Sequence, residues 1–453
     1  MGAALASLWL AASVTTAAPA LASGFSVARF GGEHGHPTTE NPTAIYYNPG
    51  AITQSPGLRG QADFVFAVRH LTYERPVDTR DVPVPPGAEG ANAGEATLTN
   101  VALGPMLGAT FSFDGLAVGL AAFTPFGGIS KWDENDAFAG NTQFPGAVDG
   151  VQRWYSIEGE LRSSYLSGAI AYAFGPVSIG IAPSLVWSVT DTVRAREVAE
   201  NRNSIEDEGR SWLDTESFDF ALGAGVLYEA VRRTLWFGAS YQSQPNFGSM
   251  TQDGTLSTLF ANGIRTESDV VLHTDLPDIV RVGGRYRIQP DVELRLFGDY
   301  QRWSVLEHQC VTTPEGECDI ADDGSAPAEA GVVYAQLRDW RDTFGVRAGG
   351  SYWVNEGVEL FAGTGFSSNA VPDSTLEPAL PDFHAVSAAL GGRFAVTEPL
   401  YLEAAYTHLF YFSRDNTGES VHPNLAAPST SSSAAGRYSQ QVGFLHAAAE
   451  LIF

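Results

Sequence analysis

Apolar and polar positions alternate with a period of two along much of the chain. The run from Tyr165 to Trp187 has no charged side chain and is long enough for a spanning helix, which needs about 20 apolar residues. A turn signal, Phe174-Gly175-Pro176, divides this run in the middle. The first half has Leu166, Gly168, Ile170, Tyr172 and Phe174 on one face and Ser167, Ala169, Ala171 and Ala173 on the other. This pattern predicts a β-hairpin with one apolar face rather than a helix.

The breaks between predicted strands are of two kinds after residue 57. Short turns such as Phe113-Asp114-Gly115 and Asn355-Glu356-Gly357 alternate with long polar segments, for example near 128–150 and 310–340. Short turns at one end and long loops at the other are typical of outer-membrane barrels, whose termini both lie at the short-turn end. The sequence therefore predicts an all-β fold, a transmembrane antiparallel β-barrel of about 14 strands over residues 57–453.

A soluble β-sandwich would show the same alternation, so other features must separate the two folds. Many runs reach the roughly 9–11 residues that a tilted strand needs to cross a bilayer. Aromatic residues such as Trp187 and Tyr300 tend to lie toward run ends, as the girdles of membrane barrels require. The chain closes on AAAELIF, and a closing strand with a terminal aromatic, here Phe453, resembles the signal by which the barrel assembly machinery recognises its substrates. These features favour the barrel.

The first residues have the pattern of an export signal. An apolar core is followed by Ala20-Leu21-Ala22, a small-x-small cleavage site, so residues 1–22 are predicted to be a signal peptide. A soluble N-terminal helix is the alternative, which Pro19 and the Ala-x-Ala ending fit poorly. Export also favours a small-loop disulfide between Cys310 and Cys318 over a metal pair or free thiols. With the barrel pattern, it predicts a location in the outer membrane of a bacterial cell.

Charge and motifs exclude several functions. The 453 residues carry a formal charge of −26, which argues against a nucleic-acid partner because the phosphate backbone repels such a surface. Most acidic residues fall in predicted loops, where solubility and cation binding are both open readings. His34 and His36 lack a second ligand cluster, and Asp319, Asp322 and Asp323 lack calcium-loop spacing, so no metal or cofactor is predicted. No Gly-x-Ser-x-Gly, phosphate-loop or His-Glu-x-x-His motif supports catalysis.

Residues 23–56, between the cleavage site and the first strand, show little alternation. The Ser23-Gly24-Phe25 end and Tyr46-Tyr47-Asn48-Pro49-Gly50 resemble the N-terminal hatch of the FadL/TodX (OmpP1) family of outer-membrane long-chain fatty acid and hydrocarbon transporters. Further similar stretches, in the family's order, are Thr124–Gly128 with Trp132, Asp275–Asp278, Asp299–Ser304, Val371–Ser374 and Leu380–Asp382. The resemblance implies a fourteen-stranded barrel whose lumen is plugged by a hatch at residues 23–56.

The resemblance assigns roles to residues at the N-terminus and in the third strand. Phe25 would line a ligand pocket, although a plug without ligand is an alternative. Asn48, Pro49 and Gly50 would anchor the hatch to the wall, where a plain turn is the alternative. Gly50 departs from the alanine that is usual in the family and gives more backbone freedom after Pro49.

A wall kink is expected at Pro125, Phe126, Gly127 and Gly128, because proline removes a ladder donor and glycines weaken a strand. The resemblance implies that this kink opens the wall, and an ordinary strand end is the alternative. The loop after it carries Trp132, Phe138 and Phe144, which we expect to form an exposed apolar groove that captures ligand.

These expectations combine into a hydrophobic-compound uptake channel. An apolar ligand, foremost a long-chain fatty acid, would bind the loops, enter a pocket in the barrel and leave sideways into the lipids of the outer membrane when the hatch shifts. Transport past the lipopolysaccharide layer would be diffusive, since no energy source is visible, and the protein is expected to be a monomer. The alternatives are a permanently plugged structural or surface-interaction barrel and a secreted soluble β enzyme.

Overall fold

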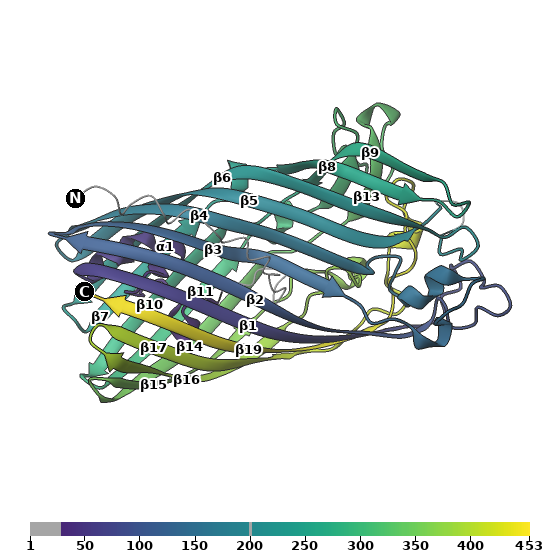
Figure 1. The fold of residues 1–453 in the computed structure, drawn as a ribbon. Helices are drawn as coiled ribbons and strands as arrows, with labels where there is room; N and C mark the ends of the chain where they lie inside the picture. The colour runs from purple at the N-terminus through teal and green to yellow at the C-terminus, as the bar shows by residue number, and fades with distance from the viewer. Residues whose placement is uncertain (1–28, 199–201) are drawn as a thin grey trace, which may run out of the picture.

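A closed antiparallel barrel forms the whole wall of the molecule (Figure 1). The computed structural model describes residues 29–198 and 202–453, so the predicted signal peptide and Phe25 lie outside the described residues. Closure comes from the pairing of β1 (Gly57–Arg75) with β19 (Arg437–Ile452) on one side and with β2 (Gly94–Phe113) on the other. The nineteen strand segments of the described residues make fourteen spans, because five spans consist of two segments each. The predicted fold class is confirmed.

Spans of one segment make up most of the wall. They are β1, β2, β3 (Leu116–Lys131), β4 (Glu158–Phe174), β5 (Val177–Arg196), β6 (Gly209–Val231), β15 (Val358–Ser367), β16 (Ala385–Thr397) and β19. The five divided spans are β7 (Leu235–Gln242) with β8 (Met250–Leu259), β9 (Arg265–Thr274) with β10 (Ile279–Gln289), β11 (Val292–Gln301) with β12 (His308–Thr312), β13 (Val332–Leu337) with β14 (Thr343–Asn355), and β17 (Leu400–Tyr411) with β18 (Arg414–Asp415).

Helices are few and short. They are η1 (Gly32–His34), α1 (Ala44–Tyr47), η2 (Pro49–Gln54), η3 (Asp136–Phe138), η4 (Pro145–Asp149), η5 (Pro245–Phe247), η6 (Trp303–Val305), η7 (Ala328–Ala330), η8 (Asp373–Thr375) and η9 (His422–Asn424). Among the described residues, no helix is both long and apolar enough to cross a membrane.

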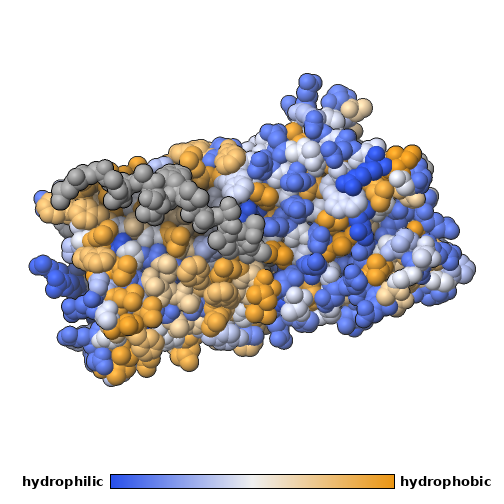
Figure 2. Space-filling model, viewed as in Figure 1, coloured by the Kyte–Doolittle hydropathy of each residue, from blue (hydrophilic) through white to orange (hydrophobic). Residues whose placement is uncertain are grey.

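The outer face of the barrel is apolar over the half that holds the end of β19 and hydrophilic toward the long loops (Figure 2). The predicted hairpin lies in this half: β4 and β5 turn at Gly175, whose φ of +65° suits glycine, and Leu166 and Ile170 are about half exposed on the outer face. Each such side chain contributes about 1.5–3 kcal/mol when it moves from water into hydrocarbon. The outer face is therefore suited to contact with membrane lipid.

The inner face is polar and holds many charges away from solvent. On β10, Arg281 and Arg285 are buried while Val282 and Tyr286 point outward, as the alternation predicts. Opposite charges meet across the lumen side of the sheet, for example Arg287 and Glu293 at 3.4 Å. Burial of such groups is tolerated only where they find partners, so the lumen is a network of polar contacts.

Residues 29–56 fill the lumen at the short-turn end, where Figure 1 shows α1 inside the barrel. All four residues of α1 are buried, and the main neighbours of η2 are β4, β5 and β6. We call residues 29–56 the plug.

Four neighbouring spans leave the sheet at one level. The segments that interrupt them are 243–249, 275–278, 302–307 and 338–342. They lie on the long-loop side of the row of paired residues Gln242, Ile279, Gln301 and Thr343. They carry Leu276, Trp303 and Trp340 into the buried core of the lumen. These interruptions were not predicted, because strand alternation reports only which face a residue occupies and not whether the ladder is continuous.

Candidate functional site

The backbone ladder between β2 and β3 is incomplete. The two strands pair from Phe113 with Leu116 up to Met106 with Phe123, and no further pairing between them is present among the described residues. Nevertheless β2 stays paired with β1 as far as Gly94, and β3 stays paired with β4 as far as Lys131. We call the stretch between 101–105 of β2 and 124–130 of β3 the ladder gap.

Side chains and one backbone hydrogen bond, from the Asp133 N–H to the Thr97 carbonyl at 2.8 Å, close the ladder gap at its loop end. The Asn100 side chain donates to the Lys131 carbonyl and accepts from the Lys131 N–H, both at 3.2 Å. Beside it, the Thr97 hydroxyl donates to the Asp133 carboxylate at 2.6 Å. Val101, in the gap, and Leu107, in the paired part of β2 next to it, are exposed on the outer face, so the gap borders the apolar part of the wall.

A β-bulge at Pro125 starts the ladder gap. The register of β3 against β4 shifts between Phe123 and Phe126, so Thr124 and Pro125 together face Ser164. A proline has no N–H for the ladder, and an extra residue bends a strand away from its neighbour. Pro125 therefore lies within the strand and not at its end, and the Gly127–Gly128 pair that follows remains in register with β4.

Pro105 on β2 was missed by the sequence reasoning. It stands next to Met106, the last residue of β2 that pairs with β3, and it cannot donate a ladder hydrogen bond. The signal was present as a Gly-Pro pair inside an apolar run, but it did not show that the two prolines lie at one level on neighbouring strands.

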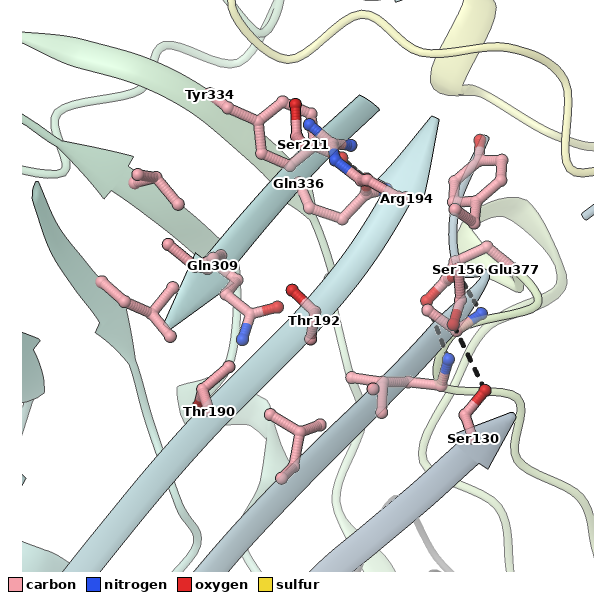
Figure 3. Close-up of a pocket in the computed structure, with 18 of the residues that line it drawn as sticks. Ser130, Ser156, Thr190, Thr192, Arg194, Ser211, Gln309, Tyr334, Gln336 and Glu377 are labelled. Carbon is pink, nitrogen blue, oxygen red and sulfur yellow. Dashed lines mark hydrogen bonds between the residues drawn. The ribbon is translucent and has the colours of Figure 1, made fainter. Parts of the chain in front are cut away.

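A cavity of about 440 Å³ lies inside the loop half of the barrel and borders the ladder gap (Figure 3). Gly128, Ile129 and Ser130 of β3 belong to its lining. Figure 3 shows Thr192 and Arg194, from one strand, close to Gln309 and Gln336 from the facing side of the cavity. The lining combines hydroxyl, amide and apolar groups, which suits a ligand with a polar end and an apolar body.

The cavity is more positive than the rest of the protein. Its charged lining residues are Arg69, Arg194, Arg196, Arg338, Glu197 and Glu377. Arg338 is paired with Glu377 at 2.6 Å, and Arg194 stacks on the Tyr334 ring at 3.6 Å. The lining thus has an excess of two positive charges when both glutamates are ionised, in a chain with a formal charge of −26.

The segment 416–436 folds down onto the cavity and forms part of its roof. Ala427, Pro428 and Thr430 line the cavity, and Glu197 accepts a hydrogen bond from the Ser432 N–H at 3.0 Å. Burial raises the pKa of Glu197 to about 7, against the smaller opposing effect of Arg194. This roof contact therefore includes a carboxyl group that titrates near neutral pH.

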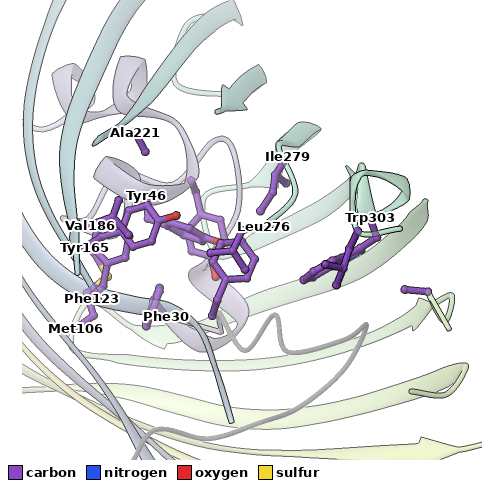
Figure 4. Packing of buried hydrophobic residues seen from close by; sticks show 14 of the residues in the cluster. Phe30, Tyr46, Met106, Phe123, Tyr165, Val186, Ala221, Leu276, Ile279 and Trp303 are labelled. Carbon is purple, nitrogen blue, oxygen red and sulfur yellow. The ribbon is translucent and has the colours of Figure 1, made fainter. Parts of the chain in front are cut away.

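Aromatic side chains of the plug pack against β3 beside the bulge (Figure 4). The Phe30 ring lies 5.6 Å from the Phe123 ring and 5.4 Å from the Tyr46 ring, and Phe123 stacks on Tyr165 at 5.7 Å. Phe126, one of the predicted kink residues, is buried in the same cluster, 6.1 Å from the Trp303 ring. The plug and the bulged strand thus share one core.

The Asn48-Pro49-Gly50 turn docks on β5 and β6. The Asn48 side chain donates to the Val226 carbonyl at 2.9 Å and to the Pro37 carbonyl at 2.7 Å. A Cβ atom added to Gly225 would lie 2.0 Å from the Asn48 amide oxygen, and one added to Gly50 would lie 2.7 Å from the Gly225 carbonyl. Glycine is thus required at position 50 because the backbone there lies too close to the wall for a side chain. The sequence suggested a different reason, the backbone freedom of glycine.

Charged residues attach the plug to other strands. His34 contacts Glu359 at 2.9 Å and Glu403 at 3.2 Å, and the Gly31 N–H donates to Asp63 at 2.8 Å. His36 packs instead on the Phe297 ring, so the two histidines do not converge. Among the described residues, no group of three or more His, Cys, Asp or Glu side chains is placed to hold a metal ion.

The three aromatic residues expected in an exposed loop groove are buried, and that expectation of exposure is wrong. Trp132, Phe138 and Phe144 are 6%, 5% and 4% exposed. Phe138 and Phe144 form a small loop core whose other buried members are Ala88, Ala91, Ala147 and Ile205. Three long loops, which precede β2, β4 and β6, cover each other's apolar side chains, and the sequence could not show that these loops are neighbours.

Cys310, on β12, and Cys318, in the following loop, form a disulfide with their Cα atoms 5.7 Å apart. This bond ties one long loop to the wall beside the cavity, which Val311 also lines.

These features define a class of protein: an outer-membrane β-barrel with an apolar outer face, a lumen filled by its own N-terminal segment and an internal cavity beside an incomplete wall. A family model described as outer membrane protein transport protein (OMPP1/FadL/TodX) matches residues 3–442. The chain therefore belongs to this family, and it is located in the outer membrane. The resemblance inferred from its motifs is confirmed.

Individual relatives are distant. The chain is 23% identical to an outer membrane protein of Neisseria meningitidis serogroup B over 81% of this chain and 80% of the relative. It is 19% identical to the long-chain fatty acid transport protein of Escherichia coli O157:H7, over 48% of each chain.

Solved structures share the fold. A FadL homologue of Pseudomonas aeruginosa superposes with a TM-score of 0.75, at 16% identity over 97% of this chain and 99% of the other. The toluene transporter TodX of Pseudomonas putida gives 0.64, at 13% identity over 97% of this chain and 100% of the other.

Proposed function

We propose that this protein is a channel for the diffusive uptake of hydrophobic compounds, with long-chain fatty acids as the foremost ligands. The observation that carries the proposal is the contact between the cavity and the ladder gap: Gly128, Ile129 and Ser130 belong to both. A ligand that leaves the cavity sideways enters lipid directly. It avoids exposing apolar surface to water, which costs about 25 cal/mol per Å².

Ligand would reach the cavity from the loop side. The rings of Phe138 and Phe144, which lie in the one loop between β3 and β4, would become a capture surface only when this loop moves away from the loops that cover it, which makes capture a conformational step. Trp132 would likewise contact ligand only after a rearrangement, since it is buried in the lumen core beside β3. Transport along this route is downhill and needs no energy source.

The plug would act as the hatch. We propose that residues 23–56 move as ligand passes and that Phe25 contacts the ligand at the end of the route. Asn48, Pro49 and Gly50 would hold the hatch on β5 and β6 while the Phe30 side moves away from β3. The kink at Pro125 would then widen without breaking further backbone hydrogen bonds, because the ladder is already absent there.

An acid is favoured over a neutral hydrocarbon by the lining of the cavity. Four arginines against two glutamates attract an anion. The relatives transport, by their names, long-chain fatty acids in one case and toluene in the other, so the family itself spans both classes of ligand. A volume of about 440 Å³ lies within the range of small-molecule sites, roughly 300–1,000 Å³.

The remaining partners follow from the barrel. We expect a monomer that contacts outer-membrane lipids and lipopolysaccharide, inserted by the assembly machinery through a terminal strand that ends at Phe453.

The proposal is tested by binding of a fluorescent long-chain fatty acid to the detergent-purified mature protein. Saturable binding by the wild type, weakened in Phe25→Ala, supports it. The matched control is Phe218→Ala, which removes a ring that is exposed on the outer face and should leave binding unchanged. If folded wild type binds neither fatty acids nor a panel of aromatic hydrocarbons, the channel proposal fails.

The second candidate is a permanently plugged surface barrel. The buried contacts of His34 with Glu359 and Glu403 favour it, since a plug held by charges inside the lumen resists displacement. Uptake of labelled fatty acid by cells that express the protein separates the two, because a plugged barrel gives no uptake above cells without it.

A further inference from the structure

Arg69 is a buried guanidinium that faces the cavity. It lies on β1, is 7% exposed and belongs to the cavity lining. Its Nε donates to the Gln440 side-chain oxygen at 2.7 Å. Among the described residues, its two Nη groups make no hydrogen bond, and no carboxylate lies within the 4.0 Å of an ion pair.

The comparison with Arg338 shows what is missing at Arg69. Arg338 lines the same cavity and is neutralised by Glu377 at 2.6 Å. The carboxylate whose field reaches Arg69 is that of Asp382, beyond ion-pair distance, and its oxygens accept hydrogen bonds from the backbone N–H groups of Ala370 and Phe383. A buried charge without a counter-ion is unfavourable, so its retention indicates a partner that arrives from outside the chain.

Arg69 also stands close to the ladder gap. Its partner across the ladder on β2 is Asn100, whose side chain holds Lys131 at the loop end of the gap. The cavity wall beside the gap is formed by Ile129 and Leu161, which offer apolar contact. A ligand whose head lies on Arg69 therefore has its apolar body next to the place where the wall is incomplete.

We propose that Arg69 binds the carboxylate of an amphipathic acid in the outer cavity and determines the preference of the channel for acids over neutral ligands of the same length. The inference rests on the proposed function and assigns a residue and an orientation to it. With Nε occupied by Gln440, the Nη pair remains as a fork that matches the two oxygens of a carboxylate. The carboxylate of the ligand stays at Arg69, so its apolar tail enters the ladder gap before its carboxylate does.

The test compares two ligands that differ only in the head group, oleate and oleyl alcohol. Binding of both is measured in detergent at pH 8 with wild type and with Arg69→Met. Wild type should prefer oleate by about tenfold or more, the range of a charge-assisted hydrogen bond. Arg69→Met should lose about tenfold for oleate and stay within about twofold for the alcohol.

Two further variants guard against misfolding and against a general charge effect. Gln440→Glu places a carboxylate beside Arg69 Nε and should abolish the preference for oleate while the arginine stays in place. Arg196→Met removes another cavity arginine, one that stacks on the Phe260 ring at 4.4 Å, and should keep the preference.

The outcomes are distinct. An unchanged oleate-to-alcohol ratio in Arg69→Met and Gln440→Glu overturns the inference, and so does an equal loss for both ligands, which would show a packing role only. Binding of neither ligand by folded wild type defeats the proposed function as well. Binding of both with no preference defeats only the assignment of Arg69.

Discussion

Two prolines inside neighbouring parts of the barrel have opposite consequences. Pro183 lies in β5, where the register against β4 is the same on both sides of it and the pairing with β6 is continuous from Val177 to Arg196. Pro125 lies in β3, where the register shifts and the ladder to β2 ends. The same residue type thus leaves one wall closed and the other incomplete.

The difference lies in the neighbouring strands. Pro125 comes with an extra residue in its strand, and β2 carries Pro105 where its own pairing with β3 stops. Two strands that both lack donors at one level cannot re-form the ladder by a small shift. The strands that face Pro183 have neither a proline nor an extra residue at its level, so only the hydrogen bonds of Pro183 itself are lost. The closed wall also carries η2, whereas the incomplete wall borders the cavity.

The largest effect is expected when the incomplete wall is made like the closed one. Pro105→Val combined with Pro125→Val restores two donors, and uptake of labelled oleate by expressing cells should fall about tenfold or more, equivalent to a barrier at least about 1.4 kcal/mol higher. Binding to the purified protein should be unchanged. Pro183→Val is the matched control and should transport like wild type. Normal uptake by the double variant would show that ligand leaves elsewhere.

The next largest effect is expected on the docking of the plug against the closed wall. Gly225→Val places a side chain where the Asn48 amide lies, and the docked plug should lose about 2–3 kcal/mol through overpacking and broken hydrogen bonds. Hydrogen exchange of residues 44–54 should accelerate. Gly168→Val, on β4 with no atom within 4 Å of the added Cβ, is the control. Equal protection in both variants would refute the docking role of Asn48-Pro49-Gly50.

A smaller effect is expected at the roof of the cavity, where Glu197 holds Ser432. The pKa of Glu197 is raised to about 7 by burial, from an ordinary value of 4.5, so the docked loop binds the proton more tightly than the open loop. The stabilisation is fully present below about pH 4.5 and is lost as the pH rises through about 7. Exchange of residues 427–433, corrected for its intrinsic rate, should therefore be faster at pH 8 than at pH 5, with a protecting free energy lower by roughly 2.5 kcal/mol at most.

Glu197→Gln is the control for this titration. It keeps a side-chain oxygen for Ser432 and removes the charge, so protection of the roof should become independent of pH between 5 and 8. A wild-type roof that is equally protected at both values would contradict the assignment.

The smallest effect on transport is expected at the disulfide. Replacing Cys310 and Cys318 with serine removes a cross-link that spans 8 positions, worth about 2–3 kcal/mol against the unfolded chain. The loop should become sensitive to protease, while oleate uptake and the contrast between Pro125 and Pro183 variants should stay within about twofold. A large loss of uptake would mean that the loop takes part in ligand capture.

Much of the architecture could be predicted from the chain. Alternation at Leu166 to Phe174 predicted a lipid-facing strand, and the alternation of short turns with long loops predicted fourteen spans and the outer membrane. Local patterns suffice for such features, because strand geometry fixes the face of each side chain. The plug motif and the kink residues were recognised by resemblance, and their roles in transport remain predictions.

Other features depended on contacts between distant segments. The burial of Phe138 and Phe144 follows from two neighbouring loops, and the ladder gap needs Pro105 and Pro125 on facing strands. In the sequence, Arg69 looks like any inward arginine of a strand. Arg69 faces the cavity and has no carboxylate partner in the part of the chain that the structure describes, and this depends on which strands lie around it.

The class of fold, the solvent that each strand face meets and the outer-membrane location could be inferred from local patterns in the chain, because these features depend on period, run length and turn type. Where the wall is incomplete, which apolar rings are covered and which buried charge has no counter-ion among the described residues could be seen only in the folded protein. The physical reason is that pairing, burial and charge compensation are properties of two surfaces in contact, and a strand pattern describes only one of them.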